Sequence, residues 1–244
     1  MICRPGKLPA GRREHNTWQP DCLLHFTSMN CIVTAGPTYE SLDKVRRLTN
    51  SSTGRLGIEL ANSLAARGHD VTLLVGTQAF YAGERRARRV ETFTTTADLR
   101  ERLQNLANQS THAVFHPAAV SDFLFGKIWS RSPQGALSEI KSGKISTRQG
   151  TLLAELVPTP KIIAGLRDWF PKARIVGWKY ETDGDRASVV RAAAKQISEC
   201  LTDACVANGP GYGDGFGIVL GNGKCSHMPD SAALFEALLQ VAEG

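Results

Sequence analysis

Residues 36–54 hold two glycines, several hydroxyls, one asparagine and two arginines, and they follow an apolar run at residues 31–35. The stretch ends in Asn50-Ser51-Ser52-Thr53-Gly54, directly before apolar residues spaced as on one face of a helix. The start of a helix leaves backbone N–H groups without partners and carries a partial positive charge, so it suits a phosphate or a carboxylate. The same spacing also fits a simple helix cap with no ligand.

The elements around this loop alternate between strand and helix patterns. Strands are predicted at residues 31–35, 70–75, 90–94, 114–115, 151–157, 174–178, 204–207 and 216–220, and helices at residues 56–67, 96–106, 161–170, 185–201 and 229–242. This alternation predicts a single α/β domain with a Rossmann-like, doubly wound, mainly parallel sheet. Because ligands bind such sheets at the carboxyl ends of strands, we expect the site in the loops after residues 35, 115, 157, 178 and 207.

Residues 124–150 are rich in Gly, Ser and Lys and have no clear periodicity. A connector of this length is unusual inside a compact domain, so we expect a mobile flap there. Residues 1–28 also lack periodicity and contain three prolines. We expect them to form a disordered extension, with a targeting segment or a misplaced start as alternatives, ahead of a folded domain at residues 29–244.

The composition excludes several classes of protein. The chain has 244 residues, of which 42% are hydrophobic, and a formal charge of +6. It has no apolar run of about 18 residues and no dense basic run with interleaved aromatics, so we expect neither a membrane span nor nucleic-acid binding. Its six cysteines contain no C-x-x-C pair. They are typical of reduced thiols in a cytoplasmic protein.

Six blocks of sequence, in order, resemble the phosphopantothenoylcysteine synthetase (phosphopantothenate–cysteine ligase) family, which is also the C-terminal part of a bifunctional coenzyme A flavoprotein. The blocks are TAGPTYESLDKVRRLTNSSTGRLG, AAVSDF, GKIS, LVPTPKII, VGWKYETD and VAN. The resemblance implies a coenzyme A biosynthesis enzyme that activates 4′-phosphopantothenate as an acyl-nucleotidylate with CTP or ATP. The amine of L-cysteine then displaces the nucleotide.

The resemblance also implies binding partners. Mg²⁺ would arrive with the triphosphate, the chain would form a homodimer, and no flavin would bind because the flavin-binding half is absent. A phosphopantothenoylcysteine decarboxylase on a separate chain stays open.

Asn50 matches the family asparagine that contacts the acyl group, and Lys144 matches the flap lysine near the phosphates. Lys141 and Arg148 remain alternatives to Lys144, because Ser and Thr follow it where bacterial members have further lysines. Of Arg46 and Arg47, which precede Asn50, one would bind the phosphate of the substrate across the dimer interface; we assign this role to Arg46, because a surface charge is the favoured role of Arg47. The resemblance implies nucleotide contacts at Gly36, Ser52, Gly54, Ala118, Ala119, Asp122, Pro158, Thr159, Pro160, Trp178, Arg191 and Lys195.

Purely structural roles also fit several of these residues. Asn50 and Asp122 are suited to cap helices, Trp178 is suited to a core, and the two alanines are suited to close packing. His116 ends an apolar strand beside the expected site, but a lone histidine there is more often structural, so we give it no catalytic role.

Two other functions compete with the ligase. A strand, a glycine turn and a helix also occur in NAD(P)-dependent Rossmann oxidoreductases. However, the chain lacks G-x-G-x-x-G, an acidic residue at the end of strand 70–75, and Y-x-x-x-K. The second alternative is a non-catalytic paralogue that binds a nucleotide without ligation.

Overall fold

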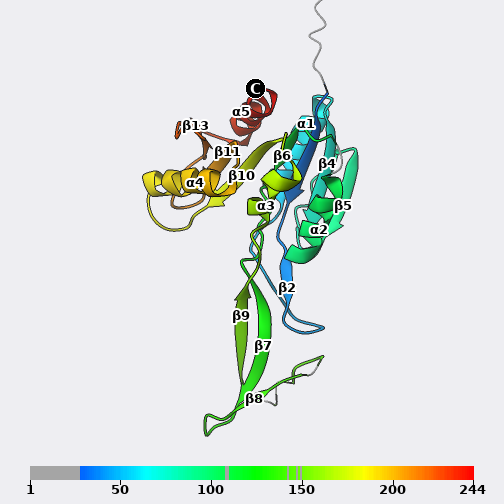
Figure 1. Ribbon diagram of the computed structural model, residues 1–244, viewed down its shortest axis with the longest axis vertical. Coiled ribbons are helices and arrows are strands. Elements are labelled where there is room, and N and C mark those ends of the chain that lie inside the picture. Colours follow the sequence, from blue (N-terminus) through cyan, green and yellow to red (C-terminus); the bar gives the residue numbers. More distant parts are fainter. Residues whose placement is uncertain (1–27, 108–109, 142, 147, 149) are drawn as a thin grey trace, which may run out of the picture.

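The computed structural model describes residues 28–107, 110–141, 143–146, 148 and 150–244. Its body is an eight-stranded sheet in the order β13-β12-β11-β10-β6-β1-β4-β5 (Figure 1). The strands are β1 (Asn30–Ala35), β4 (Asp70–Gly76), β5 (Arg89–Phe93), β6 (Ala113–Phe115), β10 (Arg174–Tyr180), β11 (Ala204–Asn208), β12 (Phe216–Leu220) and β13 (Cys225–Met228). The predicted extension at residues 1–28 lies outside the described residues except for Ser28.

Six neighbouring strands of this sheet, from β5 to β11, pair in parallel. Their spatial order is 3-2-1-4-5-6 when they are counted along the chain, which is the order of the Rossmann fold. The last two strands, β12 and β13, extend the sheet in antiparallel pairing. The predicted Rossmann-like, mainly parallel sheet is therefore confirmed, although β13 was not predicted.

Helices cover both faces of the sheet, which explains why the central strands are almost continuously apolar. One core joins α1 (Arg55–Ala66) and α5 (Ser231–Glu243) to the face that carries Val33 and Ala35. On the opposite face, Ile32 packs with α2 (Thr96–Leu106) and α3 (Ile162–Trp169), and α4 (Arg186–Cys200) covers the β11 end. None of the described helices has the length and apolar content needed to cross a membrane.

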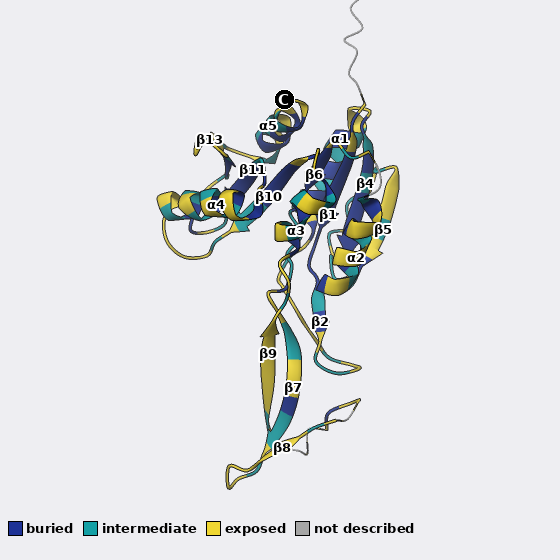
Figure 2. Ribbon diagram, in the orientation of Figure 1, coloured by how far each residue is buried: buried dark blue, intermediate teal, exposed yellow. Residues whose placement is uncertain are grey.

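A separate antiparallel sheet projects from the body. It consists of β7 (Phe123–Arg131), β8 (Leu137–Glu139) and β9 (Thr151–Pro158), and we call it the arm (Figure 1). The prediction of irregular chain after residue 124 is wrong for β7 and β8, and the predicted strand at 151–157 does not join the central sheet. Most arm residues are exposed or half-buried (Figure 2). Because neither face of the arm packs on the core, the alternation that signals a strand is weak there.

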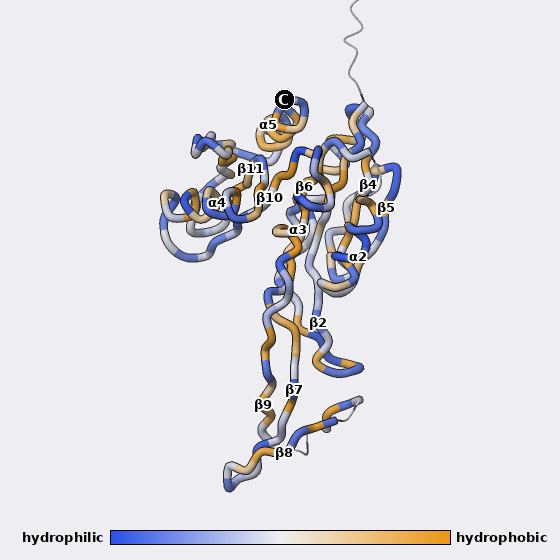
Figure 3. Tube along the Cα trace, viewed as in Figure 1, coloured by the Kyte–Doolittle hydropathy of each residue, from blue (hydrophilic) through white to orange (hydrophobic). Residues whose placement is uncertain are grey.

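A small hairpin of β2 (Tyr39–Ser41) and β3 (Arg47–Thr49) lies beside the base of the arm. It was not predicted, since each strand has three residues and Arg, Glu and Ser dilute the apolar signal. Hydrophobic stretches along β7 and β9 alternate with hydrophilic ones (Figure 3). Exposed apolar side chains on the arm include Phe123, Leu137, Leu153, Leu156 and Val157.

Candidate active site

The order of the parallel strands reverses between β1 and β6, and the loops after these two strands are hydrogen-bonded to each other. The Ala119 N–H donates to the Gly36 carbonyl at 3.0 Å, and the Thr38 N–H donates to the Ala119 carbonyl at 3.1 Å. In open α/β sheets, ligands bind outside the carboxyl ends of strands at such a switch point. The loops predicted after residues 35 and 115 therefore lie together where a ligand is expected.

Asn50 links the segment after β6 to the loop that leads into α1. Its Nδ2 donates to the carbonyls of Ala119 and Val120, at 3.2 and 3.0 Å. Both amide hydrogens are thus engaged, while Oδ1 receives no hydrogen bond from a described residue. To donate to an oxyanion, as the resemblance implies, Nδ2 would have to give up one of these carbonyls. The alternative role of Asn50 as a helix cap is wrong, because Gly54 occupies that position.

Gly36 and Gly54 have backbone angles that favour glycine, with φ of 78° and 80°. A Cβ at Gly36 would lie 2.6 Å from the Cβ of Ala79, and one at Gly54 would lie 2.9 Å from the same atom. The space beside both glycines is therefore filled by protein. Their identity is explained by packing of the loop after β4 on the β1–α1 junction, without a ligand.

The start of α1 keeps its capacity to bind an anion. Gly54 occupies its N-cap position without a side-chain cap, and Thr53 Oγ1 accepts from the Arg55 N–H at 3.1 Å. The first helical bond runs from Ile58 N–H to the Gly54 carbonyl. The N–H groups of Leu56 and Gly57, ahead of it, have no acceptor within the helix. Ser52, also predicted to bind nucleotide, is half-buried just before this point, and its N–H donates to the Asn50 carbonyl.

The segment after β6 runs along the loop after β1. The Ala118 N–H donates to Thr34 Oγ1 at 3.2 Å, and the Ser121 N–H donates to Thr38 Oγ1 at 2.8 Å. The two alanines are thus held by their backbone, with the Ala119 carbonyl shared by Thr38 and Asn50. Ala118 and Ala119 are half-buried, and Ala118 also packs against the core of α2 and α3.

Asp122 lies at the base of the arm, with an exposed side chain. The chain enters β7 directly after it, so the alternative role of Asp122 as a helix cap is wrong. The predicted turn Pro158-Thr159-Pro160 is brought to the same place. The Thr159 N–H donates to the Asp122 carbonyl at 2.9 Å, and Thr159 Oγ1 donates to the Ser121 carbonyl at 2.6 Å.

Trp178 and Asn208 lie near the carboxyl ends of β10 and β11. Trp178 packs half-buried against the core of α1 and α5, as its alternative role expects. Its buried indole Nε1 has no hydrogen-bond partner among the described residues, and neither does the buried Oδ1 of Asn208. An unpaired buried polar group costs about 1–3 kcal/mol, so these two atoms are suited to meet a ligand that offers an acceptor and a donor.

Asn208 is a candidate site residue that was not predicted. Val206 packs in the same core as Trp178, and Asn208 follows two residues later, so both side chains are on the α1 and α5 face of the sheet. The signal in the sequence was the VAN block, which ends at Asn208. The resemblance to the family implied no role for this asparagine.

Arg191 and Lys195 do not lie at the switch point. Both are exposed on α4, and Lys195 faces Glu199 at 3.6 Å with 73% of its side chain exposed. No hydrogen bond or ion pair joins either residue to the described loops after β1 and β6. Their spacing on one helix face was predicted correctly, but that face is turned to solvent.

Lys144 and Arg46 lie away from Asn50 within one chain. The exposed Lys144 is in the segment after β8, which Figure 1 shows running from the lower part of the arm toward the tip of the β2–β3 hairpin. The alternatives Lys141 and Arg148 are exposed in the same region. The guanidinium of Arg46 contacts the Asp43 carboxylate and the Ile145 carbonyl, each at 2.6 Å. In this arrangement it binds the protein rather than a substrate phosphate.

His116 is buried under the switch point. Its Nδ1 lies 2.9 Å from Thr34 Oγ1, and burial lowers its pKa from 6.5 to about 4. It is therefore neutral at neutral pH and positions Thr34, in agreement with a structural role. Among the described cysteines, burial raises the pKa of Cys31 and Cys205 to about 12, so these thiols are poor nucleophiles.

No group of three His, Cys, Asp or Glu side chains in the described part of the chain is arranged to hold a metal ion. Mg²⁺ commonly binds through one or two carboxylates together with substrate phosphates. The exposed carboxylate of Asp122, at the base of the arm, fits that mode and not a permanent metal cage.

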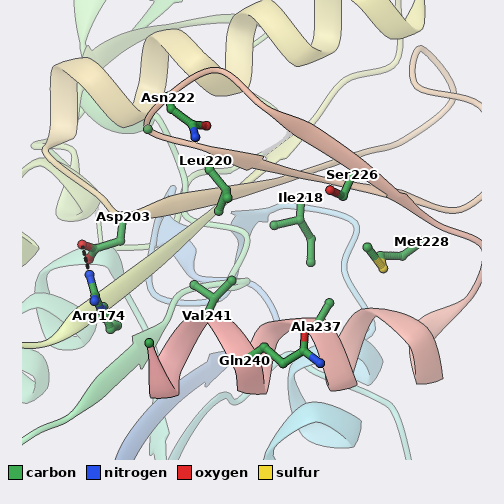
Figure 4. A pocket seen from close by; sticks show the side chains of 12 residues that line it. Arg174, Asp203, Ile218, Leu220, Asn222, Ser226, Met228, Ala237, Gln240 and Val241 are labelled. Carbon is green, nitrogen blue, oxygen red and sulfur yellow. Dashed lines mark hydrogen bonds and ion pairs between the residues drawn. The ribbon is translucent and has the colours of Figure 1, made fainter.

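A cavity of about 500 Å³ lies elsewhere, between α5 and the β12–β13 hairpin (Figure 4). Its lining includes Ile218, Leu220, Met228 and Val241, with the Arg174–Asp203 ion pair at one side. This ion pair lies where β10 and β11 begin. The cavity therefore lies toward the amino ends of the parallel strands, whereas the switch point lies at their carboxyl ends.

A family model for the DNA/pantothenate metabolism flavoprotein C-terminal domain matches residues 26–220. The chain belongs to this family. The resemblance inferred from the six blocks is thereby confirmed, and the switch-point residues Gly36, Asn50, Ala119 and Thr159 lie within the matched range.

Members of the family are similar over most of this chain. The coenzyme A biosynthesis bifunctional protein CoaBC of Thermococcus kodakarensis is 34% identical over 207 residues, which are 83% of this chain and 47% of that protein. CoaBC of Bacillus subtilis is 29% identical over 218 residues, 86% of this chain and 50% of that protein. The chain thus spans about half the length of these relatives.

Solved structures support the fold. The DNA/pantothenate metabolism flavoprotein from Streptococcus pneumoniae superposes with a TM-score of 0.76 at 26% identity, covering 88% of this chain and 99% of that one. The C-terminal domain of a CoaBC protein superposes with a TM-score of 0.68 at 22% identity, covering 88% and 94%. The second likeness shows the fold alone.

Proposed function

We propose that the chain is a phosphopantothenate–cysteine ligase of coenzyme A biosynthesis. In the first step, the carboxylate of 4′-phosphopantothenate attacks the α-phosphorus of CTP or ATP, and pyrophosphate leaves. In the second step, the amine of L-cysteine attacks the acyl carbon, the nucleoside monophosphate leaves, and an amide forms.

One observation carries the proposal. Residues from three separate blocks of the family are joined by hydrogen bonds around the carboxyl ends of β1 and β6, namely Gly36 and Asn50 from the first block, Ala119 from the second and Thr159 from the fourth. Ser121 completes the connection, since it lies in the segment after β6 and accepts from Thr159. A set of distant blocks that converges on a topological switch point is typical of a ligand site.

Because these blocks meet at the switch point, the residues around it can be given roles in the first step. The N–H groups at the start of α1 would bind phosphate oxygens. Asp122 would hold a Mg²⁺ ion that enters with the triphosphate and neutralises its charge. Trp178 Nε1 and Asn208 Oδ1 would meet polar groups of the nucleotide. Asn50 would contact the acyl group as a donor, after Nδ2 leaves one of the two carbonyls that it now binds.

We further propose that the chain acts as a homodimer. Lys144 and Arg46 belong to the proposed chemistry but lie away from Asn50 in one chain, and the arm exposes Leu156 at 50% and Leu137 at 55%. A second copy that covers the arm would bury these side chains and bring a lysine to the other protomer's switch point. Sedimentation would then give twice the monomer mass, 52.8 kDa from a chain of 26.4 kDa.

The activity is tested by pyrophosphate release. Purified protein with phosphopantothenate, L-cysteine, Mg²⁺ and either CTP or ATP should release pyrophosphate, and omission of phosphopantothenate should abolish the release. The same pair of reactions decides the nucleotide preference. Tight nucleotide binding without release would favour the non-catalytic paralogue instead.

The family match favours the ligase over an NAD(P)-dependent oxidoreductase. The loop after β1 supports this preference, because Ala79 fills the space beside Gly36 and Gly54, where a dinucleotide fold needs close backbone approach to a pyrophosphate. A nicotinamide cofactor should therefore leave the melting temperature unchanged.

A further inference from the structure

The tip of the β2–β3 hairpin is bonded to residues 143–146, which we call the lysine segment because they include Lys144. The Lys44 N–H donates to the Gly143 carbonyl at 3.0 Å, and the Ile145 N–H donates to Asp43 Oδ2 at 3.2 Å. Arg46 Nη2 donates to the Ile145 carbonyl at 2.6 Å. The backbone on both sides of Lys144 is thus held by the hairpin.

Asp43 is the centre of this contact. Its Oδ1 accepts from the N–H groups of Val45 and Arg46, at 2.9 and 2.7 Å, and so shapes the turn. Its Oδ2 accepts from Nε and Nη2 of Arg46, at 3.1 and 2.6 Å, as well as from Ile145. The Asp43 side chain is only 1% exposed. The Arg46 guanidinium and these N–H groups hold the pKa of its carboxyl well below the ordinary value.

The base of the hairpin is fixed to the body. The Tyr39 N–H donates to the Thr94 carbonyl at 3.0 Å, and the buried Glu40 accepts from the Thr96 N–H at 3.0 Å. Thr49 Oγ1 donates to the Thr38 carbonyl at 2.9 Å. Asn50 follows directly, so one short hairpin has Asn50 at its base and the lysine segment at its tip.

We infer that Asp43 is a positioning residue for Lys144, because its carboxylate holds the lysine segment and the Arg46 guanidinium in one arrangement at the tip of a braced hairpin. The inference rests on the proposed ligase function. Asp43 touches no substrate in this role. It acts by keeping the backbone beside Lys144 in place, so its loss should affect the same step as the loss of Lys144.

The variant Asp43→Asn tests this contact, since the amide keeps the shape of the side chain and removes its charge. Hydrogen–deuterium exchange of the full-length protein, without ligand, should become about 10-fold faster for the peptide that includes Lys144 and Ile145, while peptides from β1 and α1 stay unchanged. Glu139→Gln is the matched control, because Glu139 is an exposed carboxylate of β8. It should change neither.

Single-turnover kinetics test the action through Lys144. Asp43→Asn should slow amide formation about 10-fold and leave formation of the acyl-nucleotidylate within twofold of the wild type. In a Lys144→Ala background the same change should have less than a twofold further effect, since the positioned group is gone. If Asp43→Asn caused a purely structural defect, it would slow both steps, and its rate loss would add fully to that of Lys144→Ala.

Several outcomes would overturn the inference. If hydrogen–deuterium exchange at the lysine segment is unchanged in Asp43→Asn, Asp43 does not hold this segment. If the rate losses of Asp43→Asn and Lys144→Ala are fully additive, Asp43 does not act through Lys144. If the wild-type protein releases no pyrophosphate, the proposed function itself fails. In that case the exchange experiment still decides separately whether Asp43 holds the lysine segment.

Discussion

The switch point and the arm are built in opposite ways. At the switch point, backbone groups of two loops bond to each other over a buried sheet, and Thr34, Thr38 and Asn50 add side-chain bonds. The arm stands away from the core, and its lysine segment is bonded to the hairpin around one carboxylate, Asp43. The region that we propose to bind the nucleotide is therefore already formed within one chain. The position of Lys144, which we propose to act in the second step, depends on contacts between the lysine segment and the hairpin.

The largest expected effect belongs to the preformed region. Asn50→Ala should lower the rate of acyl-nucleotidylate formation by about 10³-fold, because it removes the amide expected to contact the acyl group and unties the two loops. Rapid-quench measurement of pyrophosphate checks this. An unchanged rate would take Asn50 out of the site.

A substitution in the arm should cause a smaller loss of rate, and in the second step of the reaction. Lys144→Ala should slow amide formation by about 10²-fold and leave the first step almost unchanged, so that the acyl-nucleotidylate accumulates. Lys141→Ala is the control from the same region. If Lys141→Ala gives the larger loss, the assignment of the flap lysine moves to Lys141.

The buried body should also respond to pH through His116. Its pKa of about 4 in the folded protein is below the ordinary value of 6.5, so the unfolded chain binds the proton more tightly. The resulting stability is fully present above pH 6.5 and is lost as the pH falls toward 4, with a total of about 3 kcal/mol.

Urea unfolding of wild type and His116→Asn between pH 7 and pH 4 measures this contribution. The wild type should lose more stability than the variant over that range. Parallel curves for the two proteins would contradict the burial of a neutral imidazole under the switch point.

The smallest effect is expected at the carboxyl end of β11. Asn208→Ala should raise the KM for the nucleotide about 5- to 10-fold, since one hydrogen bond to the ligand is lost. The melting temperature of the unliganded protein should not fall, because Oδ1 has no partner among the described residues. A lower melting temperature with an unchanged KM would make Asn208 a structural residue.

The sequence predicted the body well and the arm poorly, for a physical reason. Strands such as β4, buried on both faces, are almost continuously apolar, and Gly68 with φ of 83° ends α1 as expected. The arm has no core beneath it, so β7 mixes Phe125 and Ile128 with Lys127 and Arg131 and gives no clear period.

The candidate site was predictable only in part. Motif order identified Asn50, Ala119 and Thr159, which the fold brings together. It did not reveal that Arg46 is engaged by Asp43, or that Arg191 and Lys195 face solvent, because these depend on three-dimensional neighbours. Asn208 was identified by its buried Oδ1, which has no hydrogen-bond partner in the described part of the chain, and no spacing of residues in the sequence reports this.

The most direct test of the central claim is a quenched single-turnover reaction followed by mass spectrometry. Wild-type protein with phosphopantothenate, Mg²⁺ and the preferred triphosphate, but without L-cysteine, should accumulate a phosphopantothenoyl nucleotidylate. Addition of L-cysteine should convert it to phosphopantothenoylcysteine and nucleoside monophosphate. Absence of both compounds with CTP and with ATP would contradict the ligase function.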